Sequence, residues 1–330
     1  MKKTLITLAA VAATSAAFAQ SSVTLYGVAD LGLGDSNAPN TDIRMNGNAL
    51  MNNGSSRLGV RGVEDLGGGL KAAFNFEQGI NATTGATDTF VFTAPGAGQQ
   101  TVTTTTFQRA ANVSLMGGFG AIKLGRTLTP SFFGVAAWEL TGTANYSVVA
   151  NQFGFAGAGA RNNAELSYTT PSFGGLTATL GTVLEGNTGV NATQGTAAKY
   201  DMNVIYRGGP ITAALSYNQV QNNGPQGITL GAKYDFGAFQ IAGSYNESER
   251  AGGATAAEGF SLGAGTKLGP LMLVVDVARD TEFKDTDVLL EAKYPLSKRT
   301  FVYAAFLRDG EGKARRTTVN NYGVGIRHNF

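Results

Sequence analysis

The chain has 330 residues, with 46 glycines, no cysteine, one histidine and one tryptophan, and only 15% of its residues are charged. The absence of cysteine excludes disulfide scaffolds and thiolate metal sites, and a single histidine excludes mechanisms that need two. The hydrophobic share of 43% argues against disorder, and the glycines follow no three-residue period, which excludes collagen. These exclusions leave a β-rich protein whose glycine content needs an explanation.

Residues 1–19 have the pattern of a cleaved export signal. Lys2 and Lys3 precede a short apolar stretch, and Ala17-Phe18-Ala19 matches an A-x-A cleavage site. We therefore expect a secretory signal peptide at 1–19 and a single mature domain over 20–330; an N-terminal membrane anchor is the less favoured alternative. Without the leader the chain has 23 basic and 23 acidic residues. This balance gives no support for nucleic-acid binding.

Alternation of apolar and polar residues with a period of two dominates the rest of the chain, and helical periodicity is limited to the leader and residues 132–140. No run of 18 or more apolar residues follows the leader, which excludes a helical membrane protein. Alternating segments of this length are typical of β-strands. Sixteen can be counted, at 22–34, 55–65, 69–78, 106–116, 120–127, 162–170, 175–186, 197–207, 211–221, 227–236, 238–249, 258–268, 271–282, 286–295, 299–309 and 320–330.

The connections between these segments alternate between short and long. Short turns such as Gly67-Gly68-Gly69 and Gly208-Gly209-Pro210 are rich in glycine and proline. Long gaps lie at 35–54, 79–105 and 128–161, and we expect the first two to be surface loops. An even strand number with short turns on one side and long loops on the other is typical of an outer-membrane β-barrel.

Aromatic residues gather at the segment ends that lead to short turns, and Phe301 and Tyr303 follow such a turn. Aligned rings form the interfacial girdle of a membrane barrel, whereas chance β-propensity is the alternative explanation. A soluble two-sheet sandwich would share the period of two but would bury its apolar faces. The leader, the even strand count and the aromatic placement favour the barrel. The segment-end aromatics are Tyr168, Tyr206, Tyr234, Phe236, Tyr294 and Phe330.

Four segments resemble the Gram-negative general porins, in particular their β-proteobacterial branch. They are SVTLYGVADL at 22–31, SRLGVRGVEDLGGGL at 56–70, SLMGGFGAIKLGR at 114–126 and VGIRHNF at 324–330. The resemblance implies an all-β fold, a transmembrane antiparallel 16-stranded β-barrel, in the outer membrane. It also implies a homotrimer whose water-filled pores let small hydrophilic solutes and ions diffuse passively.

The resemblance assigns further roles to the loops and to the last residue. In this family the third external loop folds inward and constricts the channel, and here that loop is the 128–161 gap. Phe330 resembles the C-terminal aromatic that family members present to the outer-membrane assembly machinery, and it can belong to the girdle as well. Outer-membrane lipids and lipopolysaccharide are the expected surroundings. Loop residues Lys313, Arg315 and Arg316 are candidates for contact with lipopolysaccharide phosphates.

The constriction of this family sets basic wall residues against acids on the inward loop. By resemblance, Arg57, Arg109 and Arg161 match wall arginines. Alternation independently points Arg57 and Lys123 into the lumen, opposite outward-facing apolar neighbours. The orientations of Arg109 and Arg126 stay open.

The loop side of the expected constriction is poor in negative charge. Glu139 is the one acid between residues 128 and 160, whereas many relatives carry several acids there. Because pore selectivity follows local charge, we expect a moderate anion preference.

Enzymatic chemistry finds no support in the sequence. An outer-membrane barrel enzyme needs a nucleophile or activated water with a base, and His328 lies on the outward face of the last segment. We expect no catalytic residue, metal ligand or cofactor. His328 fits a membrane-interface or trimer-contact residue. An adhesin or structural barrel is the other alternative, and the long third loop favours a pore.

The glycines receive three expected roles. Some form the short turns, and Gly154, Gly157 and Gly159 let the third loop bend into the barrel. Gly323 and Gly325 lie on the lumen face, where we expect them to leave room for water.

Overall fold

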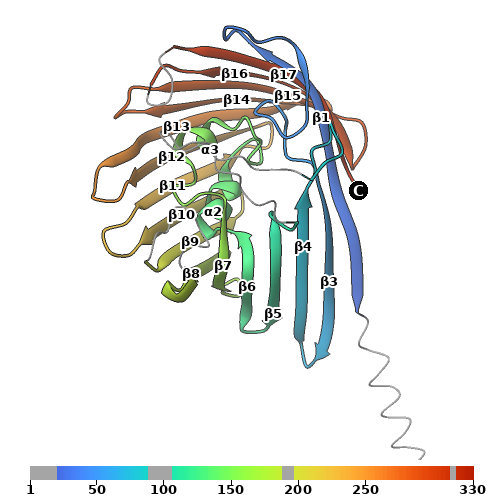
Figure 1. Ribbon diagram of the computed structural model, residues 1–330, viewed down its shortest axis with the longest axis vertical. Coiled ribbons are helices and arrows are strands. Elements are labelled where there is room, and N and C mark those ends of the chain that lie inside the picture. Colours follow the sequence, from blue (N-terminus) through green and yellow to red (C-terminus); the bar gives the residue numbers. More distant parts are fainter. Residues whose placement is uncertain (1–20, 88–105, 188–196, 313–316) are drawn as a thin grey trace, which may run out of the picture.

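The computed structural model describes residues 21–87, 106–187, 197–312 and 317–330 (Figure 1). The predicted signal peptide and the basic residues Lys313, Arg315 and Arg316 lie outside these described residues.

A single antiparallel sheet closes into a barrel. The described residues form seventeen strands, of which the three-residue β2 (Arg44–Asn46) is an addition within the first long loop. The other sixteen form the barrel wall, so the predicted fold class is confirmed. They are β1 (Ser22–Ser36), β3 (Arg57–Gly67), β4 (Leu70–Gly79), β5 (Ala110–Gly117), β6 (Gly120–Leu128), β7 (Arg161–Thr169), β8 (Leu176–Val183), β9 (Lys199–Gly208), β10 (Ile211–Val220), β11 (Gln226–Asp235), β12 (Phe239–Glu249), β13 (Thr255–Leu268), β14 (Leu271–Asp280), β15 (Thr286–Pro295), β16 (Thr300–Asp309) and β17 (Val319–Asn329).

Strand β1 closes the barrel. Val28 pairs with Asn329 of β17 on one edge and with Arg57 of β3 on the other. Phe330 and Gly27 exchange two main-chain hydrogen bonds of 3.0 Å each. Closure removes the open edges of the sheet, which satisfies the backbone where no water is present.

The two faces of the wall differ in chemistry in the way that separates a membrane barrel from a soluble sandwich. On β9, Met202 and Val204 point outward and are 39% and 44% exposed, whereas Asp201 and Asn203 point inward and are 1% and 2% exposed. Exposed apolar residues outside and buried polar residues inside recur around the wall. This arrangement suits lipid outside and a polar lumen inside. In the described part of the chain, no helix is long and apolar enough to cross a membrane.

The outer face carries most of the expected aromatic girdle, but the prediction is wrong for Phe301 and Tyr303, which lie on the lumen side. Tyr303 is 3% exposed and donates a hydrogen bond of 2.6 Å to Asp30 Oδ1 in the lumen. Phe301 shares its parity, because the outward positions of β16 are Val302 and Ala304. The six residues that are exposed as predicted are Tyr168, Tyr206, Tyr234, Phe236, Tyr294 and Phe330.

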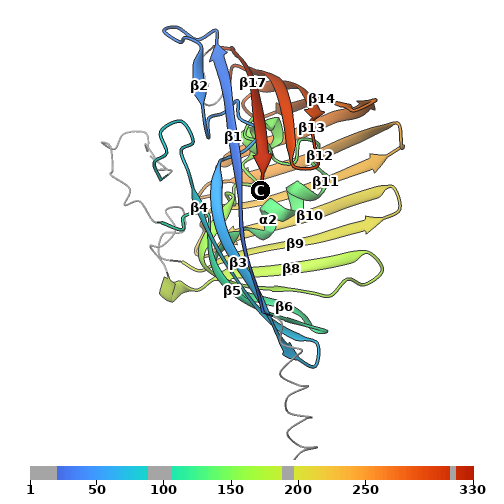
Figure 2. The same cartoon turned by 90° about the vertical axis from the view of Figure 1, so that its right-hand side faces the viewer.

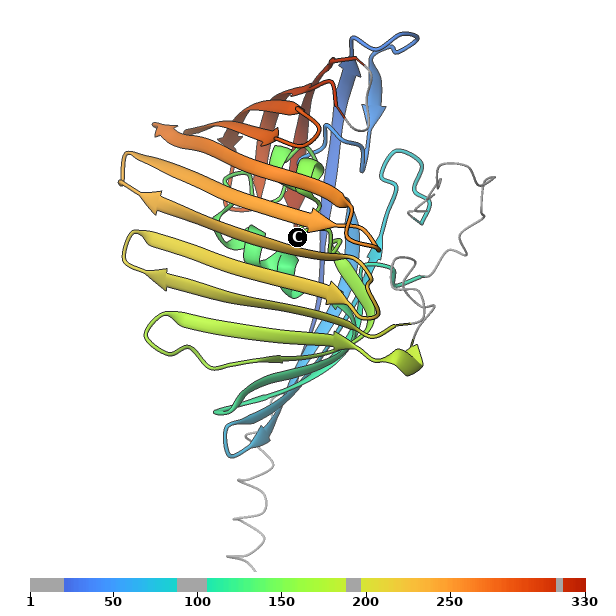
Figure 3. The same ribbon diagram turned by 90° about the vertical axis from the view of Figure 1, so that its left-hand side faces the viewer.

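The third long loop folds into the barrel, as the resemblance implies (Figures 2 and 3). It carries α2 (Pro130–Trp138) and α3 (Val148–Phe153), and η1 (Glu185–Asn187) is a separate short 3₁₀ turn after β8. Thr129 caps α2 by accepting from the Phe132 N–H, and α3 ends at Gly154, whose φ of 57° is left-handed. Helix α2 packs against β8–β11 and α3 against β12–β15. The weak helical pattern at 132–140 therefore corresponds to α2.

The first long loop was expected to lie at the surface over 35–54, and this is wrong for its second half. Met51, Asn52 and Asn53 are at most 6% exposed because they enter the lumen. The Asn52 amide donates to Asp30 Oδ1 at 3.1 Å. A polar, glycine-rich segment resembles a solvated loop in sequence, but here side chains of the wall take the place of water.

Lumen glycines make room for protein, and the expectation that they make room for water is wrong. A Cβ on Gly325 would collide with the Tyr303 ring, and one on Gly323 would lie 2.8 Å from Met51 Cβ. A Cβ on Gly231 would collide with the indole of Trp138. The inward loops can approach the wall this closely only where the wall has no side chain.

Candidate functional site

Basic residues from several strands meet on one side of the lumen. Arg57 begins β3, Arg109 precedes β5, Arg126 lies near the end of β6 and Arg161 begins β7. Arg109 is a charged neighbour of each of the other three, and also of Arg327 on β17. We name these five residues the arginine cluster. The structure thus brings together four of the five basic wall residues that the sequence nominated.

Glu77 of β4 is the carboxylate within this cluster. Its Oε1 accepts from Arg109 Nε at 2.7 Å, and its Oε2 lies 3.5 Å from Arg57 Nε. The Tyr26 hydroxyl donates to the same carboxylate at 2.9 Å. Charge-assisted contacts of this kind fix two guanidinium groups in place. Glu77 is not among the site residues predicted from the sequence, although alternation places it on the polar face of its strand.

Main-chain carbonyls hold two further arginines. Arg161 Nε donates to the carbonyl of Arg109 at 2.8 Å. Arg126 donates to the carbonyl of Gln108 and to Asn163 Oδ1, which places it at this site. The side chains of Arg57 and Arg109 keep 22% and 15% of their surface exposed, so the cluster stays in contact with the lumen.

Arg327 links the cluster to the first loop. It donates to Asn53 Oδ1 at 2.9 Å and to Asn329 Oδ1 at 3.2 Å, and its guanidinium carbon lies 5.9 Å from the Phe301 ring centroid. Arg327 is not among the site residues predicted from the sequence, although alternation in the last strand places it on the face opposite the outward His328. The pattern gave its direction, but only the inward first loop shows what it contacts.

Lys123 points into the lumen but lies under the third loop. Its ammonium nitrogen is 6.0 Å from the ring centroid of Phe133 on α2, and Glu165 is its charged neighbour. The structure does not place Lys123 in the arginine cluster.

Glu139 closes the turn between α2 and α3. Its carboxylate accepts from Thr141 Oγ1 at 2.6 Å, from the Thr143 N–H at 2.7 Å and from Ser147 Oγ at 2.8 Å. The residue is 3% exposed, and Glu291 of the far wall is among its charged neighbours. The one acid of the third loop is therefore turned into the loop instead of toward the arginines.

Polar side chains of β9 fasten the start of the third loop to the wall. Asp201 Oδ1 accepts from the Ser131 N–H at 2.9 Å and from Ser131 Oγ at 2.7 Å. The Asn203 amide donates to the Pro130 carbonyl at 2.7 Å. The carboxylate thus sits at the positive end of α2, where a negative charge is stabilised.

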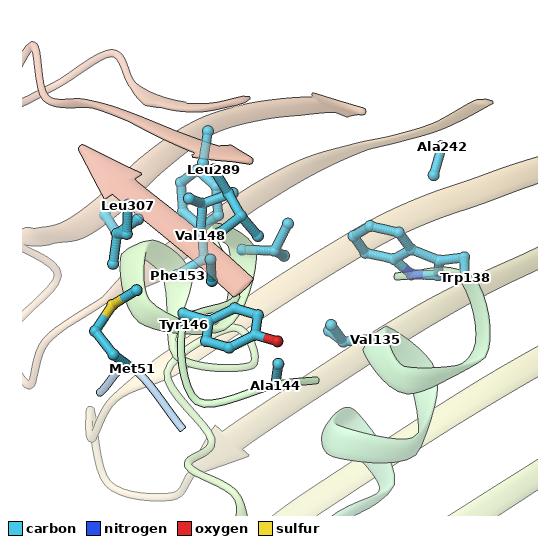
Figure 4. Close-up of a cluster of buried hydrophobic side chains, with 14 of the residues drawn as sticks. Met51, Val135, Trp138, Ala144, Tyr146, Val148, Phe153, Ala242, Leu289 and Leu307 are labelled. Carbon is cyan, nitrogen blue, oxygen red and sulfur yellow. The ribbon is translucent and has the colours of Figure 1, made fainter. Parts of the chain in front are cut away.

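An apolar cluster fastens the rest of the loop (Figure 4). Trp138 and Tyr146 of the loop are at most 1% exposed although they lie inside a polar lumen. Burying large apolar side chains such as these stabilises the packed loop by several kcal/mol, because removing apolar surface from water contributes about 25 cal/mol per Å². The loop members shown are Val135, Trp138, Ala144, Tyr146, Val148 and Phe153, and their partners are Met51, Ala242, Leu289 and Leu307.

A hydrogen-bonded chain joins both inward loops to β15. The Tyr146 hydroxyl donates to Glu291 Oε1 at 2.6 Å and accepts from the Asn53 amide at 2.9 Å. Burial and the charge of Glu291 raise the pKa of Tyr146 well above its ordinary value, so its hydroxyl remains a donor. Lys293 Nζ contacts Glu291 Oε2 and the Thr141 carbonyl, both at 3.0 Å. The position of the third loop therefore depends on the first loop and on β15.

A closed barrel with an apolar outer face, a polar lumen and an inward loop beside a charged wall defines a class of protein, the channel-forming barrel of an outer membrane. Among the described residues, no group of three or more His, Asp or Glu side chains could hold a metal ion. The Gram-negative porin family matches residues 7–329, and the chain belongs to this family.

Relatives and solved structures agree with this assignment. Outer membrane porin protein 32 of Delftia acidovorans is 33% identical over 94% of this chain and 90% of the relative. An outer membrane porin protein of Bordetella pertussis is 29% identical over all of both chains. The anion-selective porin from Comamonas acidovorans has a TM-score of 0.73 and 28% identity, covering 94% of this chain and all of that one. OmpT of Vibrio cholerae, with a TM-score of 0.65 and 14% identity over 94% of this chain and 98% of that one, shares the fold.

The family and the barrel together define the activity. The protein is an outer-membrane porin that lets small hydrophilic solutes and ions pass passively, and its family consists of channels, not enzymes. The predicted fold, function and location are confirmed.

Proposed function

We propose that this porin prefers anions and that the arginine cluster sets this preference. One observation carries the proposal: the other four guanidinium groups of the cluster gather around Arg109, and Glu77 is the one carboxylate with which Arg57 and Arg109 form ion pairs among the described residues. The cluster stands on β3, β6, β7 and β17 and before β5, whereas the helices of the third loop pack against β8–β15. The narrowed passage therefore runs beside the arginines.

Arginine suits this task because a guanidinium stays charged at every relevant pH and its fixed plane can line a wall. A selective pore must attract an ion without holding it. Here Glu77 already accepts a hydrogen bond from the guanidinium of Arg109, and a main-chain carbonyl accepts one from that of Arg161. Weak, shared attraction of this kind favours passage over tight binding.

The opposite side offers little free negative charge. The carboxylate of Glu139 is used inside the loop, and that of Glu291 is paired with Lys293 at 3.0 Å. We assign Glu139 the role of shaping the inward loop, and Lys123 and Arg126 that of basic groups at its base. The similarity to a solved structure named as the anion-selective porin from Comamonas acidovorans supports an anion preference for this chain as well.

The reversal potential across a planar bilayer in a KCl gradient tests the preference. We expect the sign of an anion-preferring channel, and Arg57→Gln should lower the anion-to-cation permeability ratio. One charge at about 4 Å in a water-like medium is worth about 1 kcal/mol, so the change has an upper limit of about fivefold. Lys298→Gln, in the turn after β15, is the matched control. A clear cation preference of the wild-type channel would overturn the proposal.

We also infer a homotrimer, because Vibrio cholerae OmpT has been described in a trimer form and shares this fold. His328, exposed on the outer face, is a candidate contact between subunits or with the lipid interface. Light scattering of the detergent-purified protein should give three times the mass of one chain. A monomeric mass under gentle extraction would contradict this inference.

Two further proposals concern export and assembly. We propose that cleavage removes residues 1–19, and that Phe330 serves the outer-membrane assembly machinery besides sitting in the girdle. N-terminal sequencing of the mature protein should begin at Gln20. Deletion of Phe330 should lower the amount of folded barrel in the membrane more than Phe236→Ala does. We further infer that lipopolysaccharide surrounds the loop ends.

A further inference from the structure

A second group of basic residues lies closer to the short-turn end of the lumen than Arg57, Arg109, Arg126 and Arg161. Each member stands on a lumen-facing position within four residues of a short turn. Short turns of such barrels face the periplasm. The group, which we name the basic collar, consists of Lys71, Lys123, Arg207, Lys233, Lys267 and Lys293.

Contacts with the third loop place two members of the collar directly. Lys123 lies over the Phe133 ring, and Lys293 Nζ donates to the Thr141 carbonyl. Both therefore lie under the inward loop, on the periplasmic side of the constriction.

Strand parity places the others. Arg207 shares the lumen-facing positions of β9 with Asp201, which is bonded to the loop. Lys233 shares those of β11 with Gly231, where Trp138 packs. The same alternation carries Lys267 on β13 and Lys71 on β4 into the lumen.

The collar is spread around the wall. Its members stand on β4, β6, β9, β11, β13 and β15, which are mostly alternate strands. Thr212 pairs with both Arg207 and Lys233, and Met272 pairs with both Lys267 and Lys293. The two members of each pair are thus level and two strands apart, a separation of about 10 Å.

Acids offset part of this charge, because Asp65 pairs with Lys71 in the β3–β4 register, Glu165 is the charged neighbour of Lys123, and Glu291 contacts Lys293. Asp65 and Asp235 lie at the same end, and each accepts a turn N–H, at 2.9 Å from Gly67 and 2.7 Å from Gly237. Within the described residues, the contact between Lys293 and Glu291 is the one ion pair that the collar makes. A net positive ring therefore remains at this mouth.

We propose that the basic collar is a second anion-selective element, which concentrates small anions at the periplasmic mouth and makes anion conduction depend on direction. The inference rests on the passive-channel function but not on the arginine cluster. The Debye length is about 10 Å at 0.1 M salt and about 3 Å at 1 M. Fields of neighbouring members therefore merge at low salt and separate at high salt.

Single cysteines test the collar directly, because the chain has none of its own. The Lys233→Cys and Lys267→Cys channels are each reconstituted in a planar bilayer and exposed, from either chamber, to a methanethiosulfonate reagent. One reagent adds a negatively charged sulfonate group to the cysteine, and the other adds a positively charged trimethylammonium group. In 0.1 M KCl the sulfonate should lower anion current at one voltage polarity by about twofold and weaken or reverse the rectification, with no effect at 1 M. The trimethylammonium reagent should restore the wild-type current.

Lys298→Cys, in the turn after β15, is the control at the same rim. An equal change there, or no change at Lys233 and Lys267, would overturn the inference. Arg57→Gln with the collar intact separates the two elements, since it should lower anion preference while keeping the directional asymmetry. Loss of the asymmetry in Arg57→Gln would also count against the collar.

Discussion

The two sides of the lumen wall carry polar residues in the same alternating pattern but use them differently. On the side of β3–β7, Arg57 and Arg109 keep part of their surface exposed beside Glu77. On the side of β9–β15, Asp201 and Glu291 are at most 4% exposed because the third loop covers them. The carboxylates that the loop covers hold it in place, and the arginines beside the loop face the passage. A lumen charge thus acts on solutes only where no loop removes it from water.

The cover also explains why many buried acids do not make the pore cation-selective in our proposal. A buried carboxylate with bonded partners has little field left for a passing ion. Asp201 directs its charge to the start of α2, and Glu139 to the turn that follows it. Two kinds of variant test this difference: one uncovers the wall beneath the third loop, and the other changes the charge on the side of the arginine cluster.

The largest expected effect comes from uncovering the far wall with Trp138→Ala. This change leaves a cavity against Gly231 and should cost about 3–5 kcal/mol of unfolding free energy. The loop then separates from the wall, so single-channel conductance should rise and anion preference should fall as covered acids meet water. Phe133→Ala on the same helix, where the ring is 41% exposed, is the control. Equal effects of both changes would show that Trp138 has no special role in holding the loop.

A smaller effect is expected from Glu77→Gln, which leaves the arginine cluster without its carboxylate. Hydrogen bonds to a charged group are worth about 1.5–3 kcal/mol, so stability should fall by about this amount. The anion-to-cation permeability ratio should rise, because Arg57 and Arg109 lose the carboxylate with which they form ion pairs. Glu64→Gln, exposed on the outward face of β3, controls for loss of a negative charge. A lower ratio in Glu77→Gln would mean that the carboxylate preorganises the cluster more than it neutralises it.

The smallest effect concerns Asp285, in the loop after β14, which accepts a hydrogen bond from Gln152 of α3. Burial, and then the charges of Asp309 and Asp280, raise its pKa above the ordinary value. A raised carboxyl pKa means that the folded state favours the protonated form, so its contribution to stability falls as pH rises from about 4 through the raised pKa. Asp285→Asn should flatten this part of a melting-temperature-against-pH curve and leave selectivity unchanged. Asp42→Asn, in the exposed half of the first loop, should leave the curve as it is.

Local sequence patterns were sufficient for everything that depends on period. Alternation gave the sixteen wall strands and the inward direction of Arg57 and Lys123, because a strand turns successive side chains to opposite faces. The same rule could have nominated Glu77 and Arg327, which stand on polar faces of β4 and β17. Alternation could not show which of these charges lie near the constriction, because charged residues at every level of the lumen occupy the same inward-facing strand positions.

Loops were beyond the reach of periodicity. Met51 and its neighbours resemble a solvated loop in composition, yet they are buried against Asp30 and Tyr303. Glu139 stands alone in the third loop as an acid, yet the loop's own hydroxyl and N–H groups take up its charge. Contacts between segments far apart in the chain decide both outcomes.

The sequence by itself determined the barrel, its sidedness and the family, since these follow from alternation, turn chemistry and motifs that are local in the chain. Only the tertiary structure decided which charged side chains remain exposed to the water of the lumen. That choice depends on where the third and first loops pack, and the packing depends on lumen glycines such as Gly231 and Gly323, which leave space for Trp138 and Met51. Burial under a loop turns a carboxylate such as Asp201 into an anchor, and exposure beside the loop leaves the arginines free to act on ions.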